Sequence, residues 1–176
     1  MAHDIPDLLV LKRHRDLEGV RETLWWRRGV LALLTAFLIL GLANVFGQRP
    51  STVTAVAPAA SLKLYAPTHL RGGLLFSARF HIVARRDLKN ATLVLDPGWL
   101  EGMAVNTIEP SPLGEASRNG RVSLQLGHIP AGQSHILFMQ FQVNPTNIAW
   151  HRPQNVELDD GNTRVLVIHR SITIFP

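Results

Sequence analysis

The sequence has 176 residues and contains no cysteine. The chain therefore has no disulfide framework, no thiolate metal site and no cysteine nucleophile. It also lacks a serine-nucleophile motif, a phosphate-binding glycine loop and a dinucleotide-binding fingerprint. We therefore expect a protein that is not an enzyme and that carries no cofactor. An exported domain without disulfides is also typical of a bacterial source.

Spacings that build metal sites are missing as well. Eight histidines are present, but no two show the helical i, i+4 spacing or a tight His-x-His arrangement. The run Asp159-Asp160-Gly161-Asn162 offers oxygen atoms that calcium prefers. The same four residues make a good hairpin turn, and we favour the turn. No metal site is predicted.

No long run of one charge occurs, although the net charge is +5 and the sequence pI is about 10.7. Such a balance favours anionic partners, for example lipid headgroups or a cell-envelope polymer. No nucleic-acid-binding motif accompanies the basic residues. A role with nucleic acid is therefore not expected.

One long apolar run is present, residues 29–46, which reads GVLALLTAFLILGLANVF. As a helix these residues would span about 27 Å, close to the thickness of a bilayer core. Trp25 and Trp26 precede the run, and Arg27 and Arg28 follow them, as expected at a membrane interface. A cleaved signal peptide is the alternative, but its apolar core is usually shorter and its cleavage site richer in small residues. We predict an uncleaved transmembrane helix.

The basic residues fix the expected direction of this span. Residues 1–28 carry many of them, and only two follow soon after the span: Lys12, Arg13, Arg15, Arg21, Arg27 and Arg28 before it, Arg49 and Lys63 after it. The positive-inside rule then places the N-terminus in the cytoplasm and the rest of the chain outside a bacterial cytoplasmic membrane. Leu17, Val20 and Leu24 share one helical face, so this cytoplasmic segment is expected to be partly helical.

Beyond the span the chain changes character twice. Residues 47–61 include PSTVTAVAPAA, which predicts a short linker or a first edge strand. Residues 62–176 show period-two alternation, clearest in residues 75–84, where Phe76, Ala78, Phe80 and Ile82 share one side. Further runs lie at residues 91–95, 103–108, 122–126, 134–143 and 163–175, separated by turn clusters. The pattern predicts an all-β fold, an antiparallel β-sandwich.

Four segments of this region resemble a known family: GLLFSARFHIV (73–83), KNATLVLD (89–96), GWL (98–100) and LGHIPAGQS (126–134). Their order is similar to that of the Ig-like repeat domains of bacterial cell-envelope proteins. The resemblance covers about residues 62–175 and implies an Ig-like β-sandwich, here as a single copy behind a membrane anchor. These motifs are turns and core strands, so they imply a fold and no activity.

Candidate contact residues are few. Trp99 follows a strand, and Trp150 stands beside His151 and Arg152 in PTNIAWHRP (145–153), which we expect to be an irregular contact loop. Tryptophan and arginine are enriched where proteins bind one another. Equally, Trp150 can fold back over one end of the sandwich.

The leading hypothesis is a non-enzymatic accessory or interaction subunit, held close to the bilayer and binding a polytopic membrane protein. The alternative is a binder of an anionic envelope polymer, through a positive face made by basic residues near one strand pair: Arg71, Arg79, Arg85, Arg86 and Lys89.

Overall fold

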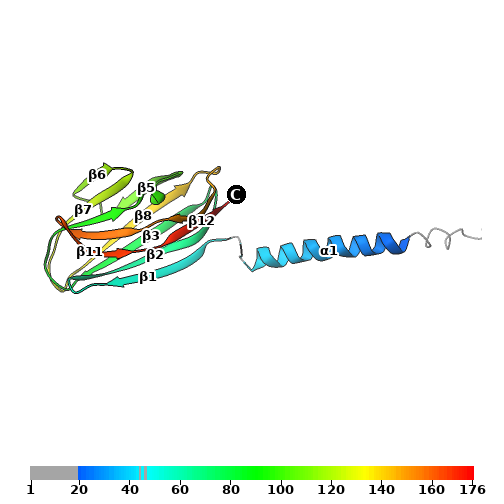
Figure 1. Ribbon diagram of the computed structural model, residues 1–176, viewed down its shortest axis with the longest axis horizontal. Coiled ribbons are helices and arrows are strands. Elements are labelled where there is room, and N and C mark those ends of the chain that lie inside the picture. The colour runs from blue at the N-terminus through cyan, green and yellow to red at the C-terminus, as the bar shows by residue number, and fades with distance from the viewer. Residues whose placement is uncertain (1–19, 44, 46) are drawn as a thin grey trace, which may run out of the picture. The chain divides into compact units, whose positions relative to one another are not determined.

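The computed structural model describes residues 20–43, 45 and 47–176, with side chains from residue 24 onward. The chain divides into two compact units, residues 1–45 and residues 46–176. Among the described residues, the first unit contains the helix α1 and the second contains strands (Figure 1). Most of the expected cytoplasmic segment, residues 1–19, lies outside the described residues.

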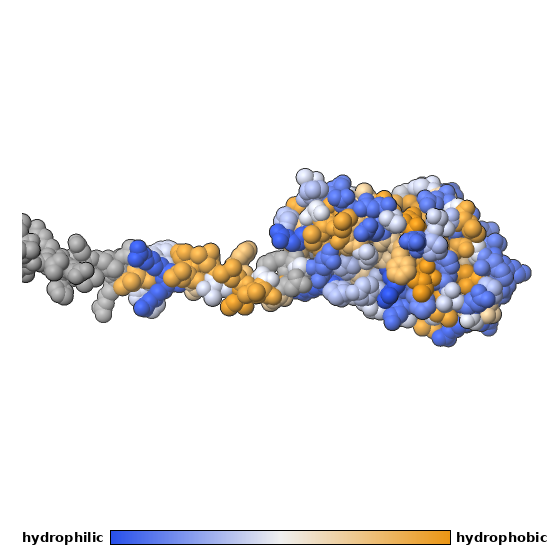
Figure 2. Space-filling view, turned by 180° about the vertical axis from the view of Figure 1, so that it is seen from behind, coloured by the Kyte–Doolittle hydropathy of each residue, from blue (hydrophilic) through white to orange (hydrophobic). Residues whose placement is uncertain are grey.

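Helix α1 spans Val20–Leu42, and its segment Leu24–Leu42 is long and apolar enough to cross a membrane. Its described side chains are all exposed, and those on the face seen in Figure 2 are mostly apolar. A helix that exposes such a surface needs an apolar surrounding. The helix begins before the predicted start at Gly29, so Trp25, Trp26, Arg27 and Arg28 belong to its first turns. Its last residue is Leu42, and residues 44 and 46, near the end of the predicted span, lie outside the described residues.

The second unit contains twelve strands and one short 3-10 helix. In chain order they are β1 (Arg49–Val56), β2 (Ala60–Arg71), β3 (Leu75–Ala84), β4 (Leu88–Leu95), η2 (Pro97–Trp99), β5 (Met103–Glu109), β6 (Gly114–Arg118), β7 (Arg121–Ile129), β8 (Ser134–Val143), β9 (Ala149–Pro153), β10 (Val156–Asp160), β11 (Thr163–Ile168) and β12 (Ser171–Phe175).

The strands form two sheets. The larger has the order β5-β8-β3-β2-β12-β9, with β1 also paired to β2, and the smaller has the order β11-β10-β4-β7-β6. Neighbouring strands are antiparallel except β12 and β2, which are parallel. The prediction of an all-β unit is therefore confirmed.

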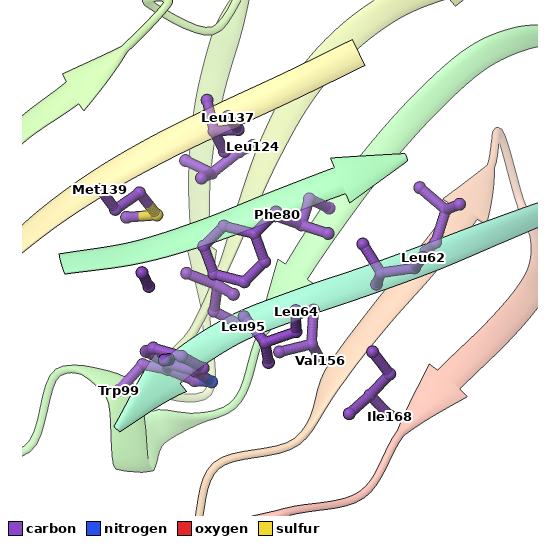
Figure 3. Close-up of a cluster of buried hydrophobic side chains, with 14 of the residues drawn as sticks. Leu62, Leu64, Phe80, Leu95, Trp99, Leu124, Leu137, Met139, Val156 and Ile168 are labelled. Carbon is purple, nitrogen blue, oxygen red and sulfur yellow. The ribbon is translucent and has the colours of Figure 1, made fainter. Parts of the chain in front are cut away.

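Alternation along the strands builds a single core between the sheets. In β3 the predicted inward residues are buried, and in β8 the same holds for Leu137, Met139, Phe141 and Val143. Both sheets contribute to one cluster of buried side chains, since β4 supplies Leu95 and β7 supplies Leu124. Figure 3 shows Leu95, Leu124, Leu137 and Met139 around Phe80, together with Trp99, the last residue of η2.

Two segments bear on the predicted boundaries. Residues 47–61 were predicted to be a short linker or a first edge strand, and they contain the strand β1, which pairs with β2 from Arg49 opposite His69 to Val56 opposite Ser61. The strand unit thus begins well before the predicted Leu62. The run 163–175 was expected to be one strand, but it divides at His169 and Arg170 into β11 in one sheet and β12 in the other.

Candidate functional site around Trp150

A β-bulge brings Trp150 and His151 to the same outer side of the larger sheet. Arg152 pairs with Ile172 and Ala149 with Ile174, so two residues of β9 lie opposite Thr173 alone. The backbone of His151 has φ +48° and its N–H donates to the Thr173 hydroxyl at 3.4 Å. A bulge re-aims side chains in this way and is frequent next to functional sites. The predicted irregular loop is therefore partly wrong, because its second half is strand β9.

The Trp150 side chain is 68% exposed, although it is held from beneath. Its ring meets Phe175 edge to face, with centroids 5.6 Å apart and planes at 89°. Phe175 also stacks with His69, at 6.1 Å between centroids. The exposed indole thus packs on one ring of β12, which in turn stacks on a ring of β2, and such packing lowers the entropy cost of binding.

Arg152 is anchored rather than free. Its guanidinium donates to the Glu101 backbone carbonyl at 2.6 Å and to the Asn147 side-chain carbonyl at 3.1 Å. Its Nε lies 3.4 Å from a carboxylate oxygen of Glu101. Asn147 in turn donates to the Gly102 carbonyl at 3.0 Å. Arg152 therefore joins the loop before β9 to the loop before β5.

Trp99 is fully buried, so its predicted role as a contact residue is wrong. Its ring packs against Phe80 and Phe141, with centroids 5.6 Å and 5.5 Å away. Its Nε1 donates to the backbone carbonyls of Gln154 and Asn155, both at 3.2 Å. Nothing in the sequence pattern separates this core tryptophan from the exposed Trp150, because each follows a proline-bearing turn.

A cavity of about 370 Å³ lies next to His151, between β12 and the end of β2. Its lining combines hydroxyl groups, imidazoles and one guanidinium: Thr68, His69, His151, Arg170, Ser171 and Thr173. No carboxylate and no aliphatic side chain is among these lining residues. The Thr68 hydroxyl and His69 Nδ1 are 3.1 Å apart and share a hydrogen bond.

Arg170 is the unusual member of this lining. Its guanidinium lies over the Trp99 ring at 5.2 Å and donates to the Pro67 backbone carbonyl, while its Nε is buried without a partner. Burial lowers the pKa of Arg170 to about 10, so the group is still charged at neutral pH. Burial, then the charges of Arg49 and His151, lowers the pKa of His69. The lining contains the charged Arg170 and no carboxylate, so the cavity is electropositive.

Sequence reasoning missed Arg170, although one signal was present. His169 and Arg170 interrupt the alternation of run 163–175, and the interruption marks the crossing between sheets.

Other predicted features fall elsewhere. Gly161 has φ +59° and closes the β10–β11 hairpin, which confirms the turn interpretation of that run. Within the described residues no group of three histidine or acidic side chains is placed to hold a metal ion.

Basic residues of the predicted positive face lie at different ends of β2. Arg71 ends β2, whereas Arg85 donates its backbone N–H to Ala59 at the opposite end of that strand. Arg71 therefore lies apart from Arg85 and Arg86 of the proposed positive face.

No protein-family model matches this chain, and no curated protein matches it. Among solved structures, it is similar to AvmM, which catalyses macrocyclization in alchivemycin A biosynthesis, at 9% identity over 74% of this chain and 90% of that one, with a TM-score of 0.43. A GH20 exo-β-N-acetylglucosaminidase from Vibrio harveyi matches 73% of this chain at 9% identity with a TM-score of 0.31. A β-glucosidase from Listeria innocua also matches 73%, at 10% identity with a TM-score of 0.28. This chain spans less than a fifth of either glycosidase, 18% and 16%. Likenesses this low assign neither a fold family nor an activity.

Proposed function

We propose that this protein is a non-enzymatic, membrane-anchored interaction subunit that binds a polytopic membrane protein through the surface around Trp150. The observation that carries the proposal is the exposed indole of Trp150, which packs edge to face on Phe175. Tryptophan side chains that are exposed but conformationally fixed are typical centres of binding energy in protein interfaces.

The anchor in this proposal is α1, held in a bacterial cytoplasmic membrane with the N-terminus in the cytoplasm. The strand unit is then an Ig-like sandwich outside that membrane, in line with the turn and strand motifs of its sequence. Strand β1 begins only six residues after α1 ends, counting residues 43–48. Such a stretch reaches about 20 Å at most. An anchored domain on so short a connection has access to proteins in the same membrane and little else.

The connection also favours one end of the strand unit. Arg49 pairs with His69, and His69 stacks on Phe175, which supports Trp150. The surface around Trp150 thus belongs to the end of the sheet at which β1 begins.

Single cysteines introduced into the cysteine-free chain test the anchoring. We expect Ser134→Cys to react with a membrane-impermeant maleimide on intact spheroplasts, and Ala2→Cys to react only after lysis. Both variants should stay in the pellet after alkaline carbonate extraction. Labelling of Ala2→Cys from outside, or release of the protein by carbonate, contradicts the proposal.

A further inference from the structure

The cavity between β12 and the end of β2 is lined by groups that donate hydrogen bonds or carry positive charge. Ser171 has no partner for its hydroxyl in the described structure, and the Thr173 hydroxyl accepts from His151 and keeps its own hydrogen to donate. Hydroxyl donors beside a guanidinium are the arrangement that binds oxyanions, since each oxygen accepts a charge-assisted or neutral hydrogen bond.

The guanidinium of Arg170 lacks a counter-ion. It makes one hydrogen bond, to the Pro67 carbonyl, and no acidic side chain in the described residues lies within ion-pair distance of it. The other arginines of the strand unit that form ion pairs do so near the surface, as Arg121 does with Asp96 and Glu157. A partly buried cation without a partner is costly, and an anion that enters the cavity removes part of that cost.

We propose that this cavity binds a phosphate group, and that the phosphate belongs to the headgroup of an anionic phospholipid. The surroundings of the cavity favour a lipid over a soluble phosphate. Phe175 stacks on the lining residue His69, and Trp150 packs on Phe175 and precedes the lining residue His151, so apolar rings lie next to the cavity. Aromatic rings of this kind are enriched at the headgroup level of bilayers.

The lipid source rests on the proposed anchoring, because the short connection after α1 keeps the β1 end of the strand unit near a bilayer. The phosphate chemistry does not rest on it. The size of the cavity, about 370 Å³, admits a headgroup phosphate and excludes a folded protein segment.

The test is a calorimetric titration of the full-length protein in a non-ionic detergent. Three probes are compared: phosphatidylglycerol, diacylglycerol with the same chains and no phosphate, and free glycerol phosphate. We expect phosphatidylglycerol to bind at least 10-fold more tightly than glycerol phosphate, and diacylglycerol not to bind. Arg170→Gln should weaken phosphatidylglycerol about 10- to 100-fold, the loss expected for a charged hydrogen-bond donor.

Two further variants keep the result interpretable. Thr173→Val retains the side-chain shape and should weaken binding about 5-fold, which is the value of one neutral hydrogen bond. Arg164→Gln removes an arginine of β11 that pairs with Glu157 far from the lining residues, and it should leave binding within 2-fold. Unfolding temperatures of all variants show whether each one folds.

Binding of phosphatidylglycerol that neither Arg170→Gln nor Thr173→Val changes overturns the proposal. Glycerol phosphate that binds as tightly as the lipid overturns the lipid source and leaves a soluble phosphate ester as the ligand. Because the titration needs only folded protein in detergent, its failure is distinct from release of the protein by carbonate.

Discussion

The guanidinium of Arg170 lies 5.2 Å from the centre of the Trp99 ring, and this contact joins the surface cavity to the core. Trp99 is fixed by Phe80 and Phe141 and by two backbone carbonyls. Cation–π contact at a desolvated site stabilises by about 2 kcal/mol. The cationic floor of the cavity is thus as rigid as the sandwich core beneath it.

The two tryptophans of the strand unit should differ sharply in their effect on stability. Trp99→Ala empties a fully buried site and should lower the free energy of unfolding by about 3–5 kcal/mol. Trp150→Ala removes an exposed ring and should cost less than about 1 kcal/mol. Urea unfolding of the full-length protein in non-ionic detergent, followed by circular dichroism, measures both. Equal losses contradict the assignment of core and surface roles.

Replacing Arg170 should change the free energy of unfolding little, because the relief of its burial cost is offset by the loss of its contacts. The lowered pKa of Arg170, about 10, corresponds to a burial cost on the order of 3 kcal/mol. Arg170→Met removes this cost and loses a charged hydrogen bond to Pro67, worth about 1.5–3 kcal/mol, and the cation–π contact. The net change in the free energy of unfolding should stay within about 2 kcal/mol. A loss as large as that of Trp99→Ala shows that Arg170 is mainly a structural cation.

Gly98 is required by the close approach of the turn η2 to β9. A Cβ at this position would lie 1.9 Å from the backbone carbonyl oxygen of Pro153, where no side chain can yield. Gly98→Ala should therefore lower the free energy of unfolding by about 3 kcal/mol or more. Gly132→Ala is the matched control, since Gly132 has open space around it and only a positive φ of +81°. The control should cost about 1–2 kcal/mol.

Stability should fall as the pH drops below the ordinary histidine pKa of 6.5. Burial lowers the pKa of His135, and burial with nearby charge lowers that of His69, so the unfolded chain binds more protons than the folded one. The contribution of each is complete above pH 6.5 and is lost as the pH falls through the folded-state pKa. His69→Gln combined with His135→Gln should flatten the pH dependence of the unfolding temperature between pH 7 and pH 5. An unchanged slope contradicts this origin.

Strands with unbroken alternation were predicted well. β3 and β8 have the predicted limits, residues 75–84 and 134–143, because each buries one complete side of its alternation. β2 was missed since Pro67 interrupts it, and proline normally argues against an interior strand. β9 was missed because its bulge at His151 breaks the period of two. The alternation of apolar and polar residues along the sequence predicts regular strands. It fails for strands such as β2 and β9, where pairing with distant strands accommodates a proline or a bulge.

The candidate site was predicted only in part. Trp150 was singled out by its residue type, and the structure gives it an exposed position. The cavity beside it was out of reach, because Thr68 and His69 come from β2 and Thr173 from β12, about a hundred residues later. Only the parallel pairing of these two strands, with Thr173 opposite His69, brings the lining together. One sequence carries no signal for such a pairing.

The central claim is that the surface around Trp150 binds a protein in the same membrane. The most direct test replaces Trp150 with a photo-crosslinking amino acid in the full-length protein, in its native membrane, with Arg85 at the far end of β3 as the control position. We predict that residue 150 crosslinks to a polytopic membrane protein identifiable by mass spectrometry, and that residue 85 does not. Recovery of the protein alone, linked only to itself or linked only to lipid, contradicts the claim.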